Sequence, residues 1–278
     1  MNIQKLKALK ERLYEDEIKR DEIDRDYLGM SSIGDRCERK LWYGFRKFNK
    51  INIGDKTDQL FKLGHLIEWG MIDLFEKKGI SIQAKQLEVS DFGNKFKGHI
   101  DGLICNGSIA NGKKILFECK SSNQANFNSI VKKGFSQFNY YHKYNAQAQC
   151  YMGYLDLTGC LFVIYNKNNS DIHLEFLEFD KDEFNILQDK AQRIILSKNP
   201  PERFYKKKLK ECDWCEHKII CRYPDLYFMS EEDEKCSICK HFLYYFNVTS
   251  EYRCVGVCAC TTNFHLAVQT CEDWELNI

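Results

Sequence analysis

The sequence has no apolar run that approaches the roughly 20 residues a membrane-spanning helix needs. Its first residues, MNIQKLKALKERLYEDE, are highly charged and lack the apolar centre of a signal peptide. There is also no internal repeat and no low-complexity segment. These absences predict a cytosolic, globular protein with no membrane partner.

The composition is that of an ordinary globular protein, with 44% hydrophobic and 29% charged residues. A chain of 278 residues holds one large domain, or a medium domain with a small appendage. The apolar pattern predicts an α/β fold that is followed by a cysteine-rich tail. Helices are expected at 58–78, 139–157 and 181–198, and strands at 80–89, 96–104, 114–120, 159–166 and 173–179.

The 14 cysteines are unusual for a cytosolic chain, where disulfides are disfavoured and clustered cysteines more often bind metal. Cys37 stands alone near the start, and nine cysteines crowd into the last third. The remaining four lie among apolar residues, which predicts that they fill the core: Cys105, Cys119, Cys150 and Cys160.

The formal net charge of +1 hides an uneven distribution. Residues 230–278 carry three Lys/Arg and eight Asp/Glu, a net charge of −5, which leaves +6 on the rest. Because nucleic acids are bound by neutralising phosphates, any such surface is expected before residue 230. The candidate basic stretches are Lys113-Lys114, Lys132-Lys133 and Lys206–Lys210, although each stretch taken alone fits a solvated surface better than a DNA-binding groove.

Two predicted strands carry the residues with the clearest chemistry. Side chains on a strand alternate between faces, so Glu118 and Lys120 point the same way. If strand 96–104 pairs with strand 114–120, Asp101 reaches that face too. Two carboxylates at one edge suit Mg²⁺ or Mn²⁺, and a metal with a nearby lysine suits phosphodiester hydrolysis.

Each of these features has a simpler explanation when taken alone. Glu118-x-Lys120 also fits a solvent-facing strand of alternating charge, and His65 also fits a core histidine with satisfied hydrogen bonds. What strengthens the catalytic interpretation is the order of the features along the chain. A helical His65 is followed by Asp101, then by Glu118-x-Lys120, and then by Gln147 and Tyr151 on one helix face.

The strings GHLIE, GHIDGLI, FECKSS and QAQCY resemble the RecB-like branch of PD-(D/E)XK nucleases. The resemblance implies a restriction-endonuclease-like core with a mixed central sheet flanked by helices. It implies that Lys120 orients or deprotonates the attacking water, and that Gln147 and Tyr151 support the site and the DNA strand. Glu68, one helical turn from His65, would join through a water molecule. The implied Mg²⁺ or Mn²⁺ ligands are His65, Asp101, Glu118 and the Cys119 carbonyl.

A second set of cysteines predicts a four-thiolate cofactor site. Cys212, Cys215 and Cys221 have C-x2-C-x5-C spacing, which leaves one ligand missing from a closed site. Cys37, in the segment CERKLWY, is the candidate for the fourth. One cysteine before the nuclease core and three after it resembles RecB-like nucleases with a 4Fe–4S cluster, such as those of CRISPR spacer acquisition and of AddB. Four thiolates alone fit zinc equally well.

The tail after residue 225 has a different composition and lies outside that resemblance. Its second C-x2-C and its short length predict a zinc-stapled, zinc-ribbon-like module at 226–278, with the nuclease domain and its iron–sulfur cluster at 1–225. Cys258 and Cys260 compete as ligands. The favoured zinc ligands are Cys236, Cys239, Cys254 and Cys271.

The sequence therefore predicts a DNA exonuclease or end-processing nuclease that acts in recombination, degradation or spacer processing. Its expected substrate is DNA that is single-stranded or has free ends. No helicase P-loop of the form GxxxxGK(S/T) is present, so unwinding would need a helicase or recombination partner. The gene is expected to be of phage or mobile-element origin, which would place the protein in the host cytoplasm. Two alternatives are a non-catalytic nucleic-acid-binding protein on a nuclease fold and a purely structural zinc protein.

Overall fold

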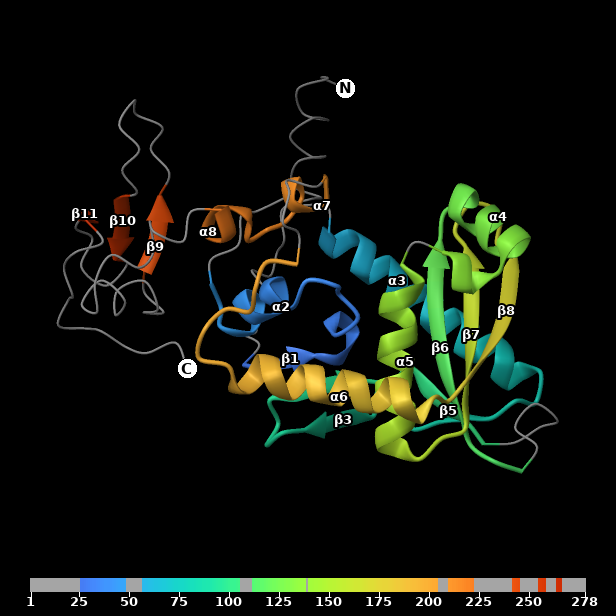
Figure 1. The fold of residues 1–278 in the computed structure, drawn as a ribbon. Helices are drawn as coiled ribbons and strands as arrows, with labels where there is room; N and C mark the ends of the chain where they lie inside the picture. Colours follow the sequence, from blue (N-terminus) through green and yellow to red (C-terminus); the bar gives the residue numbers. More distant parts are fainter. Residues whose placement is uncertain are drawn as a thin grey trace, which may run out of the picture. The chain divides into compact units, whose positions relative to one another are not determined.

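The computed structural model describes residues 26–48, 57–105, 112–138, 140–204 and 210–222, together with the backbone of three short strands beyond them. The chain divides into two compact units (Figure 1). The first comprises Met1–Arg36 and Gly54–Ser197, and the second comprises Cys37–Ile53 and Lys198–Ile278. The boundary predicted at residue 225 lies outside the described residues.

The first unit is built around a five-stranded mixed sheet, so the predicted mixed α/β architecture is confirmed. The two strands at its centre run parallel, and the other neighbours are antiparallel. A parallel pair needs a long crossover, which helices supply here. In sheet order, the strands are β2 (Ile82–Gln83), β5 (Gly102–Ile104), β6 (Ile115–Ser122), β7 (Gly159–Asn166) and β8 (Ile172–Glu178).

Three helices of this unit, at 57–77, 141–155 and 181–196, lie close to their predicted positions, whereas a fourth, at 124–133, was not predicted. Asp180 caps the helix at 181–196 by accepting hydrogen bonds from the backbone N–H groups of Asp182 and Glu183. The helices are α3 (Thr57–Lys77), α4 (Gln124–Lys133), α5 (Tyr141–Leu155) and α6 (Lys181–Leu196). Two single turns, η1 (Met30–Ser32) and η2 (Phe135–Gln137), complete the set.

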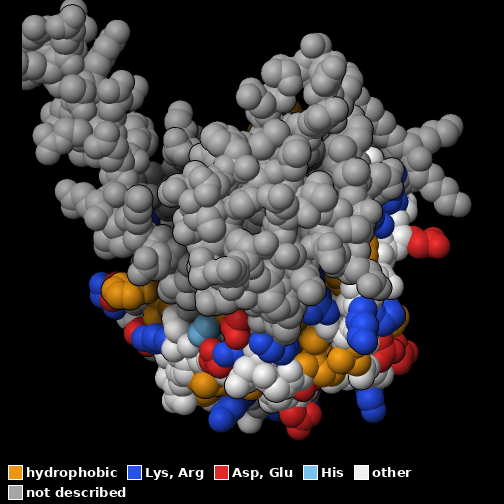
Figure 2. Space-filling model, turned by 90° about the vertical axis from the view of Figure 1, so that its left-hand side faces the viewer, with side chains coloured by type: hydrophobic (Ala, Val, Ile, Leu, Met, Phe, Trp, Pro, Cys, Tyr) orange, Lys and Arg blue, Asp and Glu red, His pale blue; other side chains and the backbone are white. Residues whose placement is uncertain are grey.

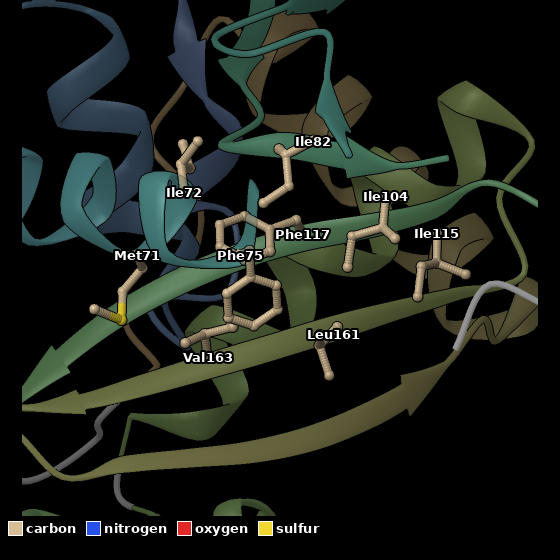
Figure 3. Packing of buried hydrophobic residues seen from close by; sticks show 9 residues of the cluster. All are labelled: Met71, Ile72, Phe75, Ile82, Ile104, Ile115, Phe117, Leu161 and Val163. Carbon is tan, nitrogen blue, oxygen red and sulfur yellow. The ribbon is translucent and has the colours of Figure 1, made fainter. Parts of the chain in front are cut away.

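The core between α3 and the sheet is a cluster of nine buried apolar residues (Figure 3). Burying each large aliphatic or aromatic side chain contributes about 1.5–3 kcal/mol before entropy is counted. Phe117 and Phe75 meet edge to face, which locks α3 over β6. Cys150 and Cys160 are buried as predicted, whereas Cys105 and Cys119 are half-buried. The nine residues are Met71, Ile72, Phe75, Ile82, Ile104, Ile115, Phe117, Leu161 and Val163.

Two predicted strands are wrong in extent, because each is divided between two sheets. The segment 80–89 contributes β2 to the large sheet and the start of β3 (Glu88–Asp91) to a small sheet of order β1-β4-β3. The segment 96–104 likewise contributes β4 (Phe96–His99) to the small sheet and β5 to the large one. The remaining strand, β1, is Leu28–Gly29. The chain therefore changes sheets between residues 99 and 102.

Asp91 ties the small sheet to the helices. Its carboxylate accepts hydrogen bonds from Tyr154 Oη at 2.7 Å, Gln188 Nε2 at 3.3 Å and the Phe92 N–H at 2.6 Å. Burial alone would raise the pKa of Asp91, but these donors outweigh it and hold the pKa below the ordinary 3.8.

We expect Asp91→Ala to lower the free energy of unfolding by about 1–3 kcal/mol near neutral pH, because hydrogen bonds to a charged acceptor are lost. Since the pKa is lowered in the folded state, this stabilisation is complete above the ordinary pKa and disappears as pH falls through the folded value. Urea unfolding of both proteins near neutral pH and at about pH 3 measures the difference, which should shrink in acid. The control is Asp73→Ala, which removes only an exposed ion pair with Lys77. Equal losses in the two variants would contradict this role for Asp91.

The second unit contains short helices and a three-stranded sheet. Within it, Trp42, Tyr43 and Phe48 form a buried aromatic group, and the His217 ring lies 5.7 Å from that of Tyr43. Among the described residues of the whole chain, no helix is long and apolar enough to cross a lipid bilayer. The elements are α2 (Glu38–Phe45), α7 (Lys210–Asp213), α8 (Lys218–Arg222), and the antiparallel strands β9 (Phe242–Tyr245), β10 (Val255–Cys258) and β11 (Phe264–Leu266).

Candidate active site

Glu118 and Lys120 lie side by side on β6, as strand alternation requires. Lys120 Nζ donates a hydrogen bond to Glu118 Oε2 at 2.7 Å. Both side chains are withdrawn from solvent, with 1% of the Glu118 side chain and 18% of the Lys120 side chain exposed. A surface strand of alternating charges would leave both groups in water, so that simpler explanation does not describe β6.

Asp101 joins this pair from the bend at which the chain changes sheets. Its Oδ2 atom accepts a hydrogen bond from the Cys119 N–H at 2.8 Å and lies 3.8 Å from Lys120 Nζ. Only residues 102–104 of the predicted strand pair with β6, and Asp101 reaches the site from just before that pairing begins. The structure thus brings Asp101, Glu118 and Lys120 together by a route that the sequence did not predict.

The two carboxylates repel each other in a site with little water. Burial first, and then the nearby Asp101, raise the pKa of Glu118 against the opposing effect of Lys120, to about 8. Burial alone would lower the pKa of Lys120, but the two acids outweigh it and hold that pKa well above 10.5. Lys120 is therefore charged at neutral pH, while Glu118 holds its proton more tightly than an ordinary glutamate.

One oxygen of this site fits an additional cation. Oε1 of Glu118 is buried and accepts no hydrogen bond from any described residue. A buried acceptor without a partner is costly, and a divalent cation shared with Asp101 would satisfy it. Within the described ranges, no three His, Cys, Asp or Glu side chains are arranged as a ready ligand set. Mg²⁺ needs only one or two carboxylates besides water and substrate oxygens.

Helix α3 brings His65 and Glu68 to the site with different exposures. The His65 side chain is 64% exposed, which contradicts the alternative of a core histidine, and its Nδ1 lies 3.5 Å from Glu68 Oε2. Glu68 is buried and accepts a hydrogen bond from Gln86 Nε2 at 2.7 Å. Burial raises the pKa of Glu68 and Asp101 raises it further. Glu68 therefore belongs to the same acidic group, whereas His65 lies at its exposed side.

The sequence matches no protein-family model and no curated protein. Among solved structures, SSO0001 is similar, with a TM-score of 0.45 and 21% identity over 78% of this chain and 92% of that one. The alkaline exonuclease LHK-Exo from Laribacter hongkongensis has a TM-score of 0.44 and 15% identity, over 62% of this chain and 88% of that one. A phage-related exonuclease from Haemophilus somnus 129PT has a TM-score of 0.41 and 13% identity, over 60% of this chain and 91% of that one. At these TM-scores the likenesses decide neither fold nor function, which rest on the residues of the chain.

Gln147 and Tyr151 lie one turn apart on α5, where Gln147 Nε2 donates to Tyr151 Oη at 3.2 Å. Tyr151 is 1% exposed, and its pKa is raised by burial first and then by the nearby Glu118. Gly98 makes room for it, because a Cβ there would lie 2.4 Å from Tyr151 Oη. Tyr151 is therefore a buried residue close to the two acids, whereas Gln147 is half-buried.

Two further residues of the site were missed by the sequence analysis. Gln86 holds Glu68 and lies where the backbone has a positive φ of 56°. Tyr144, on α5, places its ring 5.7 Å from Lys120 Nζ, a cation–π distance. No sequence signal pointed to Gln86, whereas Tyr144 lies one turn before the Gln147-to-Tyr151 motif on a predicted helix.

The four predicted cluster cysteines all belong to the second unit, and none of them forms a disulfide with a described residue. Cys37 is the N-cap residue of α2, Cys212 lies in α7, and Cys221 lies in α8. Burial raises the pKa of Cys215, and the thiols of Cys37 and Cys221 raise it further, against the effects of the His217 N–H and Lys40. The predicted zinc ligands Cys236, Cys239, Cys254 and Cys271 lie outside the described residues.

Proposed function

We propose that this chain is a metal-dependent DNA nuclease of the PD-(D/E)XK type. The observation that carries the proposal is the buried Glu118, whose Oε1 has no described partner beside Asp101 and the charged Lys120. A protein that only bound DNA would gain nothing from burying two acids around one lysine, because such charges cost more to desolvate than their pairing returns. A phosphodiesterase gains a metal site and a fixed cation.

The residues divide the work as follows. Asp101, Glu118, the Cys119 carbonyl and His65 from α3 would hold Mg²⁺ or Mn²⁺, and Glu68 would join through a water molecule. When bound, the cation polarises the phosphate and makes the attacking water more acidic. Lys120 would orient or deprotonate the attacking water, and its charge would offset the charge that develops on the phosphate.

The charge distribution supports a nucleic-acid substrate, because the basic excess of the chain lies before residue 230. On the part of the face that Figure 2 colours, Lys and Arg side chains are interspersed with acidic and apolar ones. We infer that the site acts on single strands or free ends in the manner of an exonuclease. A helicase or recombination protein would supply longer unpaired strands.

Removing divalent metal should stop DNA cleavage. Purified protein incubated with end-labelled single- and double-stranded DNA should release fragments in Mg²⁺ or Mn²⁺ and none in excess EDTA, and adding metal back should restore the rate. Gel separation of the products also distinguishes exonucleolytic ladders from internal cuts. Full activity in EDTA would contradict the proposed site, and intact DNA under every metal condition would contradict the nuclease function.

We further propose that Cys37, Cys212, Cys215 and Cys221 hold a 4Fe–4S cluster. Their spacing and their common unit support this, as does the influence of Cys37 and Cys221 on the Cys215 thiol. Thiolates suit both iron–sulfur clusters and zinc. The zinc-ribbon-like module at 226–278 stays a prediction from its cysteine spacing, although β9, β10 and β11 form the small antiparallel sheet that such a module needs.

A further inference from the structure

A pocket of about 170 Å³ opens beside the catalytic lysine and is not used by the mechanism above. Lys120 forms part of its wall, and the rest comes from the end of β6, from α4, and from η2 with the start of α5. It therefore lies next to the place where a phosphate would contact Lys120. Small-molecule pockets are usually about 300–1,000 Å³, so this one has room for a single flat group.

The aromatic wall of this pocket is suited to stacking. The rings of Phe135, Phe138 and Tyr144 are nearly parallel, with interplanar angles of 13–18° and centroids 5.9–6.3 Å apart. Phe135 is buried beneath the others, whereas Tyr140 is 53% exposed and meets Phe138 edge to face. Tyr140 is the N-cap residue of α5, yet its side chain makes no capping hydrogen bond. Its exposed ring is therefore available to a ligand.

The opposite wall is polar and firmly held. Ser121, Asn126 and the exposed Lys167 line it, and Asn123 caps α4 by accepting from the Asn126 N–H at 2.9 Å. The start of α4 is tied to the loop after β7, because the Gln124 N–H donates to Asn168 Oδ1 at 2.9 Å. The pocket thus offers flat aromatic faces, amide and hydroxyl groups, and the amino groups of Lys120 and Lys167.

The turn that carries the aromatic floor is itself fixed to the sheet. The Phe135 N–H donates to Glu175 Oε1 at 2.6 Å, and the same oxygen lies 3.0 Å from His173 Nε2 on β8. Phe135 also packs edge to face against Phe162 of β7. These contacts hold the pocket in shape before any ligand arrives, which lowers the entropic cost of binding.

We propose that this pocket receives one unpaired nucleobase, that of the nucleotide next to the scissile phosphate. The inference rests on the proposed nuclease function and deepens it, because it defines the substrate as a strand end with at least one unpaired base. Every base has a flat face, so stacking on the exposed ring of Tyr140 is independent of sequence. Lys120 and Lys167 would then contact the phosphates on either side.

The test compares DNA binding by full-length proteins that carry Glu118→Gln to prevent cleavage. Fluorescence anisotropy measures the affinity for one labelled oligonucleotide in three forms: intact, abasic at its 5′ end and abasic at its 3′ end. One abasic form should bind about five to a hundredfold more weakly than the intact one. Adding Tyr140→Ala should weaken binding of the intact form by a similar factor and remove the discrimination between the forms.

Two matched variants separate stacking from general damage. Tyr140→Phe keeps the ring and should keep the discrimination. Phe176→Ala removes an equally exposed ring, at 53%, from β8 and away from this pocket, and should also keep it. Equal affinity for all three forms, or discrimination that survives Tyr140→Ala, would overturn the base pocket. The nuclease proposal fails separately, if the wild-type protein discriminates between ends yet cleaves no DNA.

Discussion

Glu118→Gln and Lys120→Met are each expected to reduce the rate of DNA cleavage more strongly than any single substitution outside the site. Removing a residue that only hydrogen-bonds to a metal ligand lowers metal affinity or activity by about 10–100-fold. Removing the ligand Glu118 itself should therefore lower the cleavage rate by more than about a hundredfold. Lys120→Met keeps the length of the side chain but removes the charge that faces the phosphate. We expect a loss of about 10²–10⁴-fold, the range found when a proton-handling or charge-stabilising group is removed. Initial rates with labelled DNA in saturating Mg²⁺ measure both effects.

The chain offers a chemically matched control for these variants. Lys85 Nζ and Glu76 Oε1 also form an ion pair at 2.6 Å, but both side chains are more than 40% exposed. Glu76→Gln and Lys85→Met should leave cleavage unchanged, because an exposed pair contributes only about 0–1 kcal/mol and lies outside the site. Thermal melting of all four variants shows whether each is folded. If Glu118→Gln or Lys120→Met is folded and cleaves at the wild-type rate, the site assignment is wrong.

Cys37→Ser is expected to remove the iron–sulfur cluster as completely as Cys215→Ser does. Protein purified without oxygen should be brown, and each of these variants should lose the broad visible absorption together with the bound iron. Because metal binding favours the native arrangement of its ligands, the melting temperature should fall in both variants. The accompanying loss in the free energy of unfolding should exceed that of an ordinary surface substitution, which is within about 0.5 kcal/mol.

Cys105→Ser is the control for the cluster, because Cys105 is also a half-buried cysteine but belongs to the first unit. The Cys105→Ser protein should have the same colour and iron content as the wild type. A colourless wild-type protein with zinc at these four thiols would contradict the iron–sulfur proposal and leave the nuclease proposal standing. Full colour in Cys37→Ser would show that Cys37 is not a ligand.

Local sequence patterns predicted α3, α5 and α6 but missed α4. The apolar spacing placed one helix at 58–78, and the structure has α3 at Thr57–Lys77. Strand alternation placed Glu118 and Lys120 on one face, where they form an ion pair. Both features depend on residues within a few positions of each other, which is the information that periodicity carries.

The break at Asp101 was not predictable from the same patterns. Residues 96–104 read as one strand, yet β4 pairs with β3 and β5 pairs with β2 and β6. The choice of partner strands depends on residues that are distant in the sequence. Gly102 is an example, because a Cβ at this position would lie only 2.5 Å from Cγ2 of Ile82 on the neighbouring strand β2. Gln86 and the stacked rings of Phe135, Phe138 and Tyr144 were missed for the same reason, since their contacts arise only in the folded chain.

The most direct test of the central claim is a single-turnover measurement on a 5′-labelled single-stranded oligonucleotide, with excess wild-type or Glu118→Gln protein and increasing Mn²⁺. The account predicts that the wild-type cleavage rate rises with Mn²⁺ and saturates, while the Glu118→Gln rate stays at background until far higher concentrations. Equal rates in the two proteins, or a wild-type rate that does not depend on Mn²⁺, would contradict the claim that Asp101, Glu118 and Lys120 form a metal-dependent nuclease site.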